Sequence, residues 1–366
     1  MDVHENFMKR ALKLAEKGWG KTNPNPLVGA VIVKNNEIIA EGFHEALGCA
    51  HAEAAALKNA CTDVQGSTLY VNLEPCSHYG RTPPCAKAII DLGIKNVVVG
   101  MVDPNPKVSG RGIKMLKDAD INVTVGVLQN EAEKLNEIFI NYITRHKPFV
   151  IMKAAMTLDG KIASVTGESK WVSNEFSRNY VHLVRDRVSS IMVGINTVIK
   201  DNPSLTARLE SRECTDPVRI IVDSKGRIPL DSNVIHTNSK ARTIIATTDS
   251  IDKAKERQLE DNNVRIIKTP CFKGNADLQV LIDELYKLEI DSVLLEGGGT
   301  LNYSALEAGI VDKVMFFISP KIIGGENAVS PVEGAGIHLM KNAFKIRDIN
   351  LTRFDDDILI EGYISK

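Results

Sequence analysis

The sequence has almost no net charge and no long hydrophobic run. Its 45 Lys and Arg residues and 46 Asp and Glu residues leave a formal net charge of −1. This balance provides neither the basic surface that nucleic acid requires nor an attraction to an anionic membrane. No apolar stretch approaches the ~18–20 residues that a transmembrane helix needs. We therefore expect neither a nucleic acid nor a membrane as a partner.

The sequence also lacks a secretion signal and a disulfide framework. Residues 1–20 are charged throughout, and apolar residues at helical spacing precede Gly18, which predicts a first helix with a glycine stop. An even number of cysteines suggests disulfides in a short secreted chain, but this chain is long. We expect a cytoplasmic protein in which Cys61, Cys214 and Cys271 are ordinary small residues.

The chain is too long for a single hydrophobic core. Its 366 residues exceed the size at which a core stops growing, so the length predicts two domains. The boundary is expected within TRHKPFV (144–150), where a long helix ends and Pro148 precedes a strand. We predict one domain over residues 1–146 and a second over residues 147–366.

The first domain alternates strand and helix patterns. Strand-like runs occupy residues 27–33, 37–42, 67–73, 96–102 and 122–127. Helical patterns fall near residues 4–17, 51–61, 85–92, 110–118 and 129–145. The short KNNE segment between the first two strands is a hairpin signal. These patterns predict an α/β fold in which helices cover both faces of a mixed sheet.

Two short motifs in this domain carry chemistry. CAHAEAAALKNA (49–60) places His51 and Glu53 at the start of an alanine-rich helix, and LEPCSHYGRTPPC (73–85) places Cys76 after a strand and Cys85 at a helix start. One imidazole and two thiolates form a zinc site with an open fourth position, which is the catalytic pattern. Glu53 would then transfer protons between water and substrate. Alone, each motif is weak, since an H-x-E pair on a helix is usually a surface feature.

Together the motifs match the zinc nucleobase-deaminase signature H-x-E…P-C-x-x-C, except that eight residues separate the cysteines. With NPLVGAVIV (25–33) and DPNPKVSGRG (103–112), the pattern closely resembles the bacterial bifunctional riboflavin-biosynthesis deaminase–reductases. The resemblance implies a cytidine-deaminase-like domain with zinc on His51, Cys76 and Cys85. Many relatives carry a second histidine at the position of Tyr79, so we assign Tyr79 no chemical role.

The resemblance also implies a pocket for the pyrimidine and its phosphoribosyl group. The implied contacts are Asn25, His44, Arg81, Asp103 and Asn105. As isolated residues in Pro- and Gly-rich loops, they are equally consistent with turn or cap positions.

The second domain again alternates strands with helices. Strands are expected from residue 149 and at 190–195, 217–223, 241–247, 264–268, 292–296 and 311–319, with a closing hairpin near 346–353 and 356–364. Helices are expected near residues 174–188, 251–261, 276–288 and 300–308. No G-x-G-x-x-G follows a strand, so the dinucleotide fingerprint of the doubly wound fold is missing. EGGGTLNYS (296–304) could instead hold a phosphate at a helix N-terminus, or could be a flexible turn.

The family resemblance extends through this half of the chain. KAAMTLDGKIA (153–163), SKWVS (169–173), GINTVIKDNPSLTAR (194–208) and PKIIGGE (320–326) resemble the motifs of the reductase half of that family. This half is similar in fold to dihydrofolate reductase and uses NADPH. The implied cofactor contacts are Ala155, Trp171, Thr197, Asp201, Ser224, Gly298, Gly299, Thr300, Leu301, Asn302, Tyr303 and Ser304. The implied substrate contacts are Ser169, Arg185, Leu205, Arg208 and Glu296.

The two arginines suit a sugar phosphate, although Arg185 lies in a charged helix run and could face solvent. Lys153 belongs to the reductase strand motif, but the sequence does not separate binding from catalysis. Lys225 is the cation nearest to Ser224, and we expect it to favour NADPH over NADH.

The resemblance implies a two-step reaction. The first domain would hydrolyse the 2-amino group of 2,5-diamino-6-(5-phosphoribosylamino)pyrimidin-4(3H)-one, and the second would reduce the ribosyl side chain to ribityl with NADPH. We expect a homo-oligomer, either a dimer or a tetramer. A deaminase of DNA or tRNA bases is disfavoured by the neutral charge and the 5% aromatic content. A structural zinc protein would need a fourth ligand, for which His78 is the nearby candidate.

Overall fold

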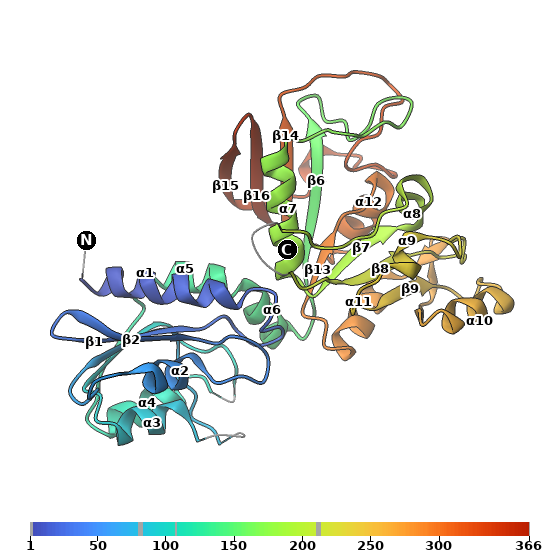
Figure 1. Cartoon of the computed structure of the whole chain (residues 1–366). Coiled ribbons are helices and arrows are strands. Elements are labelled where there is room, and N and C mark those ends of the chain that lie inside the picture. The colour runs from blue at the N-terminus through green and yellow to red at the C-terminus, as the bar shows by residue number, and fades with distance from the viewer. Residues whose placement is uncertain (1–2, 80–82, 107, 210–213, 366) are drawn as a thin grey trace. The chain divides into compact units, whose positions relative to one another are not determined.

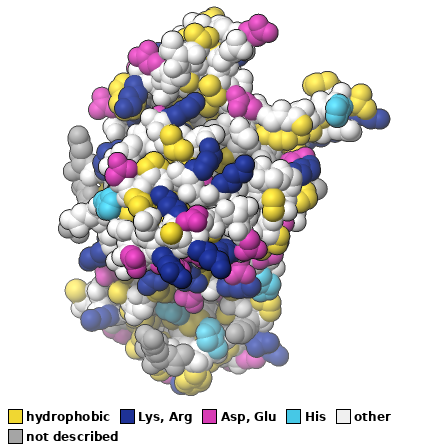
Figure 2. All heavy atoms as spheres, turned by 90° about the vertical axis from the view of Figure 1, so that its right-hand side faces the viewer, with side chains coloured by type: hydrophobic (Ala, Val, Ile, Leu, Met, Phe, Trp, Pro, Cys, Tyr) yellow, Lys and Arg dark blue, Asp and Glu magenta, His cyan; other side chains and the backbone are white. Residues whose placement is uncertain are grey.

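A computed structural model describes residues 3–79, 83–106, 108–209 and 214–365. The chain divides into two compact units, Met1–His146 and Lys147–Lys366. Each unit has its own sheet and helices (Figure 1). No helix within the described ranges is both long and apolar enough to cross a membrane. On the face shown in Figure 2, basic and acidic side chains are interspersed.

The sheet of the first unit is mixed. Its strands are β1 (Gly29–Lys34), β2 (Glu37–Phe43), β3 (Thr68–Leu73), β4 (Asn96–Met101) and β5 (Asn122–Val125), in the order β2-β1-β3-β4-β5. β1 pairs antiparallel with β2 and with β3, whereas β3–β4 and β4–β5 are parallel. Helices are therefore needed as crossover connections only in the second half of this sheet.

Side chains alternate between the two faces of this sheet. Ala30 and Ile32 of β1 pack with α2 (Ala52–Asn59), α3 (Cys85–Asp91) and α4 (Arg111–Asp118). Val31 and Val33 point to the other face and pack against α1 (Val3–Ala15). Figure 1 shows α1 and α5 (Gln129–Leu135) on one side of the sheet and α2, α3 and α4 on the other. The expected three-layer α/β arrangement is confirmed.

The second unit is built on a larger sheet. Its strands are β6 (Phe149–Thr157), β7 (Ser190–Gly194), β8 (Val218–Val222), β9 (Thr243–Thr247), β10 (Arg265–Lys268), β13 (Ser292–Leu295), β14 (Lys313–Ser319), β15 (Ile346–Phe354) and β16 (Asp357–Ile364). The order is β10-β9-β8-β7-β13-β6-β14-β16-β15, parallel from β10 to β14 and antiparallel in the closing hairpin. A small ladder, β11 (Cys271–Phe272) with β12 (Asn275–Ala276), follows β10.

Both faces of this sheet are covered. One face packs against α11 (Leu278–Lys287) and α12 (Gly299–Glu307), and the other packs against α8 (Ile195–Asp201), α9 (Asn233–His236) and α10 (Lys253–Asp261). The other helices of the described chain are η1 (Glu16–Gly18), α6 (Glu137–Arg145), α7 (Glu175–Arg187) and η2 (Met340–Asn342). This burial on both sides explains why the central residues of β7, β8 and β9 are mostly apolar and buried.

The expected helix over residues 129–145 is in fact two helices, α5 and α6, that meet at Asn136. The Asn136 side chain accepts a hydrogen bond from the Leu27 N–H at 2.8 Å and donates one to the Leu27 carbonyl at 3.0 Å. These hydrogen bonds to a residue far away in the chain occur where the helix is interrupted, and the local spacing of apolar residues does not indicate them. The short helices α8 and α9 were not expected from the sequence either.

Candidate active sites

His51, Cys76 and Cys85 form a cluster of potential metal ligands in the first unit. Their ligand atoms all lie within 4.8 Å of one another. Nδ1 of His51 is 3.5 Å from Sγ of Cys76 and 3.5 Å from Sγ of Cys85. Residues separated by up to 34 positions in the chain thus converge on one point.

Local structure explains this convergence. His51 is the N-cap of α2, in extended conformation, and Glu53 occupies the first turn. Cys76 follows the end of β3, and Cys85 is the first residue of α3. The Cys85 backbone N–H donates to Sγ of Cys76 at 3.2 Å. Because a helix start is open, His51 and Glu53 can reach neighbouring points although they are two residues apart.

The donor set fits zinc. A tetrahedral ion with Zn–S distances of about 2.3 Å and Zn–N distances of about 2.0–2.1 Å separates sulfur from nitrogen by roughly 3.5 Å. The two nitrogen–sulfur distances in the cluster are both 3.5 Å. Two thiolates and one imidazole leave the fourth position open, as in catalytic zinc sites.

The charges of the cluster suit a cation. Hydrogen bonding from Cys85 and His51 lowers the pKa of Cys76 to about 4, so this sulfur is a thiolate at neutral pH. The Cys85 proton is held by that thiolate, which raises the pKa of Cys85. A metal ion would replace this shared proton and ionise both sulfurs.

Glu53 is almost completely buried beside the ligands, with 3% of its surface exposed. Burial, followed by the nearby Cys76 sulfur, raises the pKa of Glu53 to about 7. A carboxylic acid with a pKa near neutrality can both accept and donate a proton at physiological pH. A glutamate on the exposed surface of a helix would be neither buried nor shifted to such a high pKa.

The expected pyrimidine contacts lie on the loops around the cluster. Nδ2 of Asn25 is 3.3 Å from Nε2 of His44, whose ring is 6.0 Å from that of His51. Asp103 accepts a hydrogen bond from the Asn105 N–H at 2.8 Å, and burial raises the pKa of Asp103 to about 6. Arg81 lies outside the described residues.

Glu74 is a site residue that sequence reasoning missed. Among the described residues, its carboxylate accepts hydrogen bonds from the N–H groups of Asp103, Gly110, Gly112 and Ile113, at 2.9–3.2 Å. It therefore caps α4 from a distant strand end and anchors the loop that carries Asp103. The signal in the sequence was a carboxylate directly after a strand and two residues before Cys76.

His78 and Tyr79 do not join the cluster. Within the described ranges, the group of potential ligands consists of His51, Cys76 and Cys85. The side chains of His78 and Tyr79 are both exposed. The geometry thus favours three protein ligands over the closed, four-ligand set of a structural zinc site.

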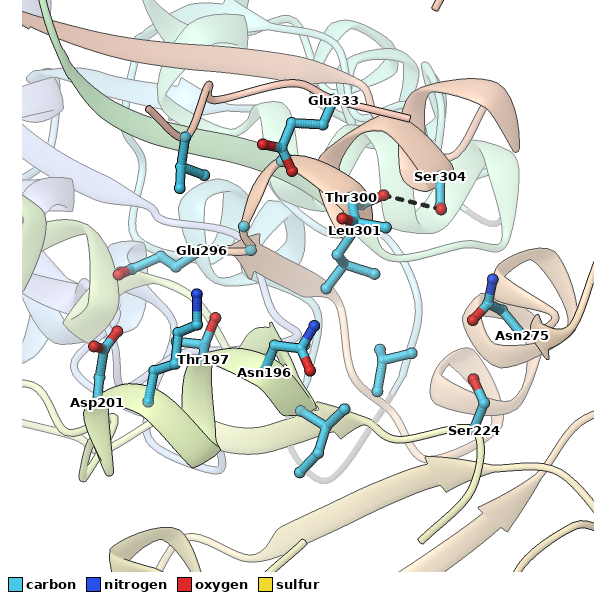
Figure 3. A pocket seen from close by; sticks show the side chains of 18 of the residues that line it. Asn196, Thr197, Asp201, Ser224, Asn275, Glu296, Thr300, Leu301, Ser304 and Glu333 are labelled. Carbon is cyan, nitrogen blue, oxygen red and sulfur yellow. Dashed lines mark hydrogen bonds between the residues drawn. The ribbon is translucent and has the colours of Figure 1, made fainter. Parts of the chain in front are cut away.

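A cavity of about 630 Å³ lies at the carboxyl ends of β8, β7 and β13 in the second unit. It is lined by residues of α8, by the turn after β8 and by Gly297–Gly299 at the start of α12. Figure 3 shows Asn196, Thr197 and Asp201 on one side of the cavity and Thr300, Leu301 and Ser304 on another. Open α/β sheets bind ligands in this crevice, where helix N-termini favour anions.

A second cavity, of about 480 Å³, adjoins the first. Ile162, Ser169, Glu296 and Gly297 line both. Two ligands placed in the two cavities would therefore meet beside Glu296.

A buried ion pair forms the wall near this meeting point. Arg185 donates two hydrogen bonds to Glu296, each at 2.8 Å, and a third to the Thr206 carbonyl at 3.2 Å. Burial opposes ionisation of Glu296. The charge and hydrogen bonds of Arg185 outweigh this burial effect and lower the pKa of Glu296 to about 2. Burial lowers the pKa of Lys153, which lines the same cavity. Arg185 faces the interior, not solvent.

The expected reductase contacts fall mostly on these cavities. Those lining the larger cavity are Thr197, Asp201, Ser224, Gly298, Gly299, Thr300, Leu301, Ser304, Ser169 and Glu296. Those lining the smaller cavity are Ala155, Trp171, Asn302, Arg185, Arg208, Ser169 and Glu296. Leu205 and Tyr303 are buried and belong to neither lining.

Family comparisons assign each half of the chain separately. Residues 1–101 match the cytidine and deoxycytidylate deaminase zinc-binding region, and residues 148–360 match the RibD C-terminal domain. The chain is 47% identical to riboflavin biosynthesis protein RibD of Actinobacillus pleuropneumoniae, over 97% of this chain and 94% of that protein. It is 43% identical to the RibD of Aquifex aeolicus, over 98% of each.

Solved structures agree with this result. A diaminohydroxyphosphoribosylaminopyrimidine deaminase/5-amino-6-(5-phosphoribosylamino)uracil reductase from Thermotoga maritima superposes with a TM-score of 0.85 and 40% identity, covering 99% of each chain. A crystal form of Acinetobacter baumannii RibD gives a TM-score of 0.87 at 34% identity, covering 100% of this chain and 99% of the other. The similarity thus spans both units.

Proposed function

The chain belongs to the RibD family, the bifunctional deaminase–reductases of riboflavin biosynthesis, and from this premise we propose how its own residues divide the two reactions. Residues 1–146 would deaminate 2,5-diamino-6-(5-phosphoribosylamino)pyrimidin-4(3H)-one. Residues 147–366 would reduce the ribosyl side chain of the product to ribityl, with NADPH as the hydride donor. The observation that carries the first assignment is the buried Glu53 beside His51, Cys76 and Cys85.

His51, Cys76 and Cys85 would hold one zinc ion per chain. Zinc bound there would polarise a water molecule and lower its pKa. Glu53 would accept one proton of the attacking water and pass it to the ring, and would then carry the second proton, from the hydroxyl formed by the attack, to the departing amine, which leaves as ammonia. Its pKa of about 7 suits both transfers. Asn25, His44, Arg81, Asp103 and Asn105 would bind the pyrimidine and its phosphoribosyl group.

The larger cavity of the second unit would hold the cofactor. Its volume of about 630 Å³, its position at the carboxyl ends of parallel strands and the glycine-rich start of α12 all suit a dinucleotide. The backbone N–H groups of residues 298–300 would bind the pyrophosphate, and Thr197, Asp201, Ser224 and Ser304 would contact the rest. NADPH supplies a hydride when bound.

The smaller cavity would hold the deaminated ribotide. Ser169, Arg208 and Lys153 would bind it, while Glu296 would accept a hydrogen bond from it at the junction with the larger cavity. Arg185 donates its hydrogen bonds to Glu296 and to the Thr206 carbonyl. Its main effect would therefore be to keep the Glu296 carboxylate ionised and oriented. The sugar C1′ and the hydride donor would meet beside Glu296. Hydride addition to C1′ would replace the C1′–O4′ bond and open the ribose, and O4′ would take up a proton.

Product analysis tests this proposal. The purified, zinc-loaded protein is given the diaminopyrimidine ribotide with and without NADPH, and the products are identified by mass. Deaminated ribotide and ammonia should form without NADPH, and the ribityl compound should form only when NADPH is added. If no deaminated ribotide forms, the first assignment is wrong; if it forms but is not reduced, the second is wrong.

A further inference from the structure

The cationic turn after β8 lines one end of the larger cavity. Lys225 and Arg227 belong to this turn, and Lys200 reaches the same cavity from α8. All three side chains are solvent-accessible, and neither lysine forms an ion pair or hydrogen bond with any residue that the structure describes. Such uncompensated cations in a cavity favour an anionic ligand.

Arg227 is held from one side by an amide and by a more distant carboxylate. Its Nη2 donates to Oδ1 of Asn196 at 3.1 Å, and its Nε is 4.0 Å from Oδ1 of Asp223. Among the described residues, Nη1 has no hydrogen-bond partner. A guanidinium held on one side, with donors free on the other, is suited to a phosphate.

Asp223 is the carboxylate that would otherwise decide cofactor choice. In sites that prefer NADH, an acidic residue after the second strand of the binding unit accepts a hydrogen bond from the ribose 2′-hydroxyl. Asp223 ends β8 in a similar place, but it is fully buried and its Oδ2 accepts the Ile228 N–H at 2.8 Å. Asp223 is absent from the cavity lining, which at that end presents Lys225 and Arg227.

The carboxylates of the cavity lie elsewhere. Figure 3 shows Asp201 and Glu296 on the opposite side from Ser224 and Asn275, with Glu333 above the start of α12. The end at Ser224 is thus cationic, although the cavity as a whole contains both signs of charge.

Strand spacing places this end at a suitable distance from the expected pyrophosphate site. β7 lies between β13 and β8, so the carboxyl ends of β13 and β8 are roughly 10 Å apart at about 4.8 Å per strand. A pyrophosphate at Gly297–Gly299, after β13, would place the adenosine ribose toward β8. The long side chains of Lys225 and Arg227 can span the remaining gap.

We infer that Arg227, with Lys225, binds the 2′-phosphate of the cofactor and so determines the preference for NADPH over NADH. The inference rests on the proposed function, because it assumes a dinucleotide in the larger cavity. Sequence reasoning had indicated only Lys225, since Arg227 stands three residues beyond Ser224. The turn at Gly226, with φ of +66°, brings both side chains to one cavity.

Equilibrium binding tests the inference without turnover. Dissociation constants are measured for NADPH and NADH by cofactor fluorescence, and for adenosine 2′,5′-bisphosphate and AMP by calorimetry. The proteins are the parent chain, Arg227→Gln, Lys225→Gln and the double variant. Arg257→Gln is the matched control, because Arg257 is an exposed arginine of α10 outside the cavity lining.

Arg227→Gln should weaken NADPH and the bisphosphate by roughly tenfold or more, as expected for a charge-assisted contact. The double variant should approach equal affinities for NADPH and NADH, while NADH and AMP bind as to the parent. Arg257→Gln should match the parent throughout.

Two failures can be told apart. If the parent binds NADPH and NADH equally, the NADPH part of the proposed function is wrong, and this inference falls with it. If the parent prefers NADPH but the double variant keeps that preference, or loses affinity for both cofactors equally, only the inference is overturned.

Discussion

The two sites of this chain differ in how their chemistry is encoded. The proposed deaminase site is compact: three side chains place their ligand atoms within 4.8 Å of one another, and Glu53 is buried beside them. The proposed reductase site consists of two adjoining cavities of about 630 and 480 Å³, formed largely by loops at the ends of strands. The first site depends on the identity of a few side chains, and the second depends on backbone shape.

This difference predicts different responses to mutation. A conservative change at one reactive side chain of the first site should slow its reaction by orders of magnitude. In the second site, many contacts share the binding energy, so a large loss requires an added group that blocks or repels the ligand.

The largest expected effect is that of Glu53→Gln. The amide can neither accept the proton of water nor pass it on, while the zinc ligands are unchanged. Deamination should fall by roughly two to four orders of magnitude, the range for a positioned general acid–base. Initial rates of ammonia release measure it. Zinc content near one per chain and an unchanged reductase rate are the controls, and normal deamination would mean that Glu53 has been misinterpreted.

Gly298→Asp should give the corresponding loss in the second site. Gly298 is the N-cap of α12 with φ of −77°, and a Cβ there would meet no atom within 4 Å, so aspartate is well tolerated by the fold. Its carboxylate would repel the pyrophosphate by several kcal/mol, on the order of a hundredfold in Kd. Calorimetric titration with NADPH measures this loss.

Gly298→Ser is the matched control for that experiment, since serine is a neutral N-cap of similar size. It should bind NADPH within a few-fold of the parent. Equal losses in the serine and aspartate variants would show that space, not charge, matters at this position.

Glu74→Gln should have an intermediate effect, on binding more than on chemistry. The amide nitrogen cannot accept, so about two of the backbone N–H groups that Glu74 now satisfies lose a partner, at roughly 1–3 kcal/mol each. The loosened loop around Asp103 should raise the deaminase KM about tenfold, with kcat and zinc content little changed. Steady-state kinetics with metal analysis test this, and a fall in kcat alone would argue against a positioning role.

His182 predicts a small effect of pH on the stability of the second unit. Burial, with Arg185 and Arg208 nearby, lowers the pKa of His182 to about 4, and its Nδ1 accepts the Arg208 N–H at 3.3 Å. As pH falls below ~6.5, the unfolded chain binds the proton first, so stability is lost progressively down to pH ~4. Allowing for partial exposure, the loss is about 1–2 kcal/mol.

His182→Gln should remove this dependence, because glutamine does not titrate. Denaturant unfolding of both proteins at pH 7 and pH 5 measures the difference. Parallel pH profiles for the two proteins would show that His182 titrates normally.

The same contrast explains what the sequence could predict. The sequence indicated His51, Glu53, Cys76 and Cys85 because zinc chemistry demands those residue types at a strand end and at helix starts, and the structure brings the three potential ligands together. The alternating and continuous apolar runs predicted the strands of both sheets, including β15 and β16. These signals are local, or depend on chemistry that few residues can perform.

The remainder depends on contacts between distant segments. Glu74 looked like an ordinary residue because its partners lie 29 to 39 positions away. Asn136 ends α5 through Leu27, which lies 109 positions away. Arg185 was expected to face phosphate or solvent. Its partner Glu296 lies 111 positions away, so the sequence of the helix that carries Arg185 could not indicate this ion pair. Arg227 needed the turn at Gly226 to reach the cavity.

The central claim is that each half of the chain carries one complete reaction. Mixing Glu53→Gln protein with Gly298→Asp protein tests it most directly. The mixture receives the diaminopyrimidine ribotide and NADPH, and the ribityl product is quantified by mass. We predict that each variant alone forms this product at no more than about a hundredth of the parent rate and that the mixture forms it far faster, since deaminated ribotide released by one variant is reduced by the other. If the Gly298→Asp protein releases deaminated ribotide but the mixture still forms no ribityl product, the claim is contradicted.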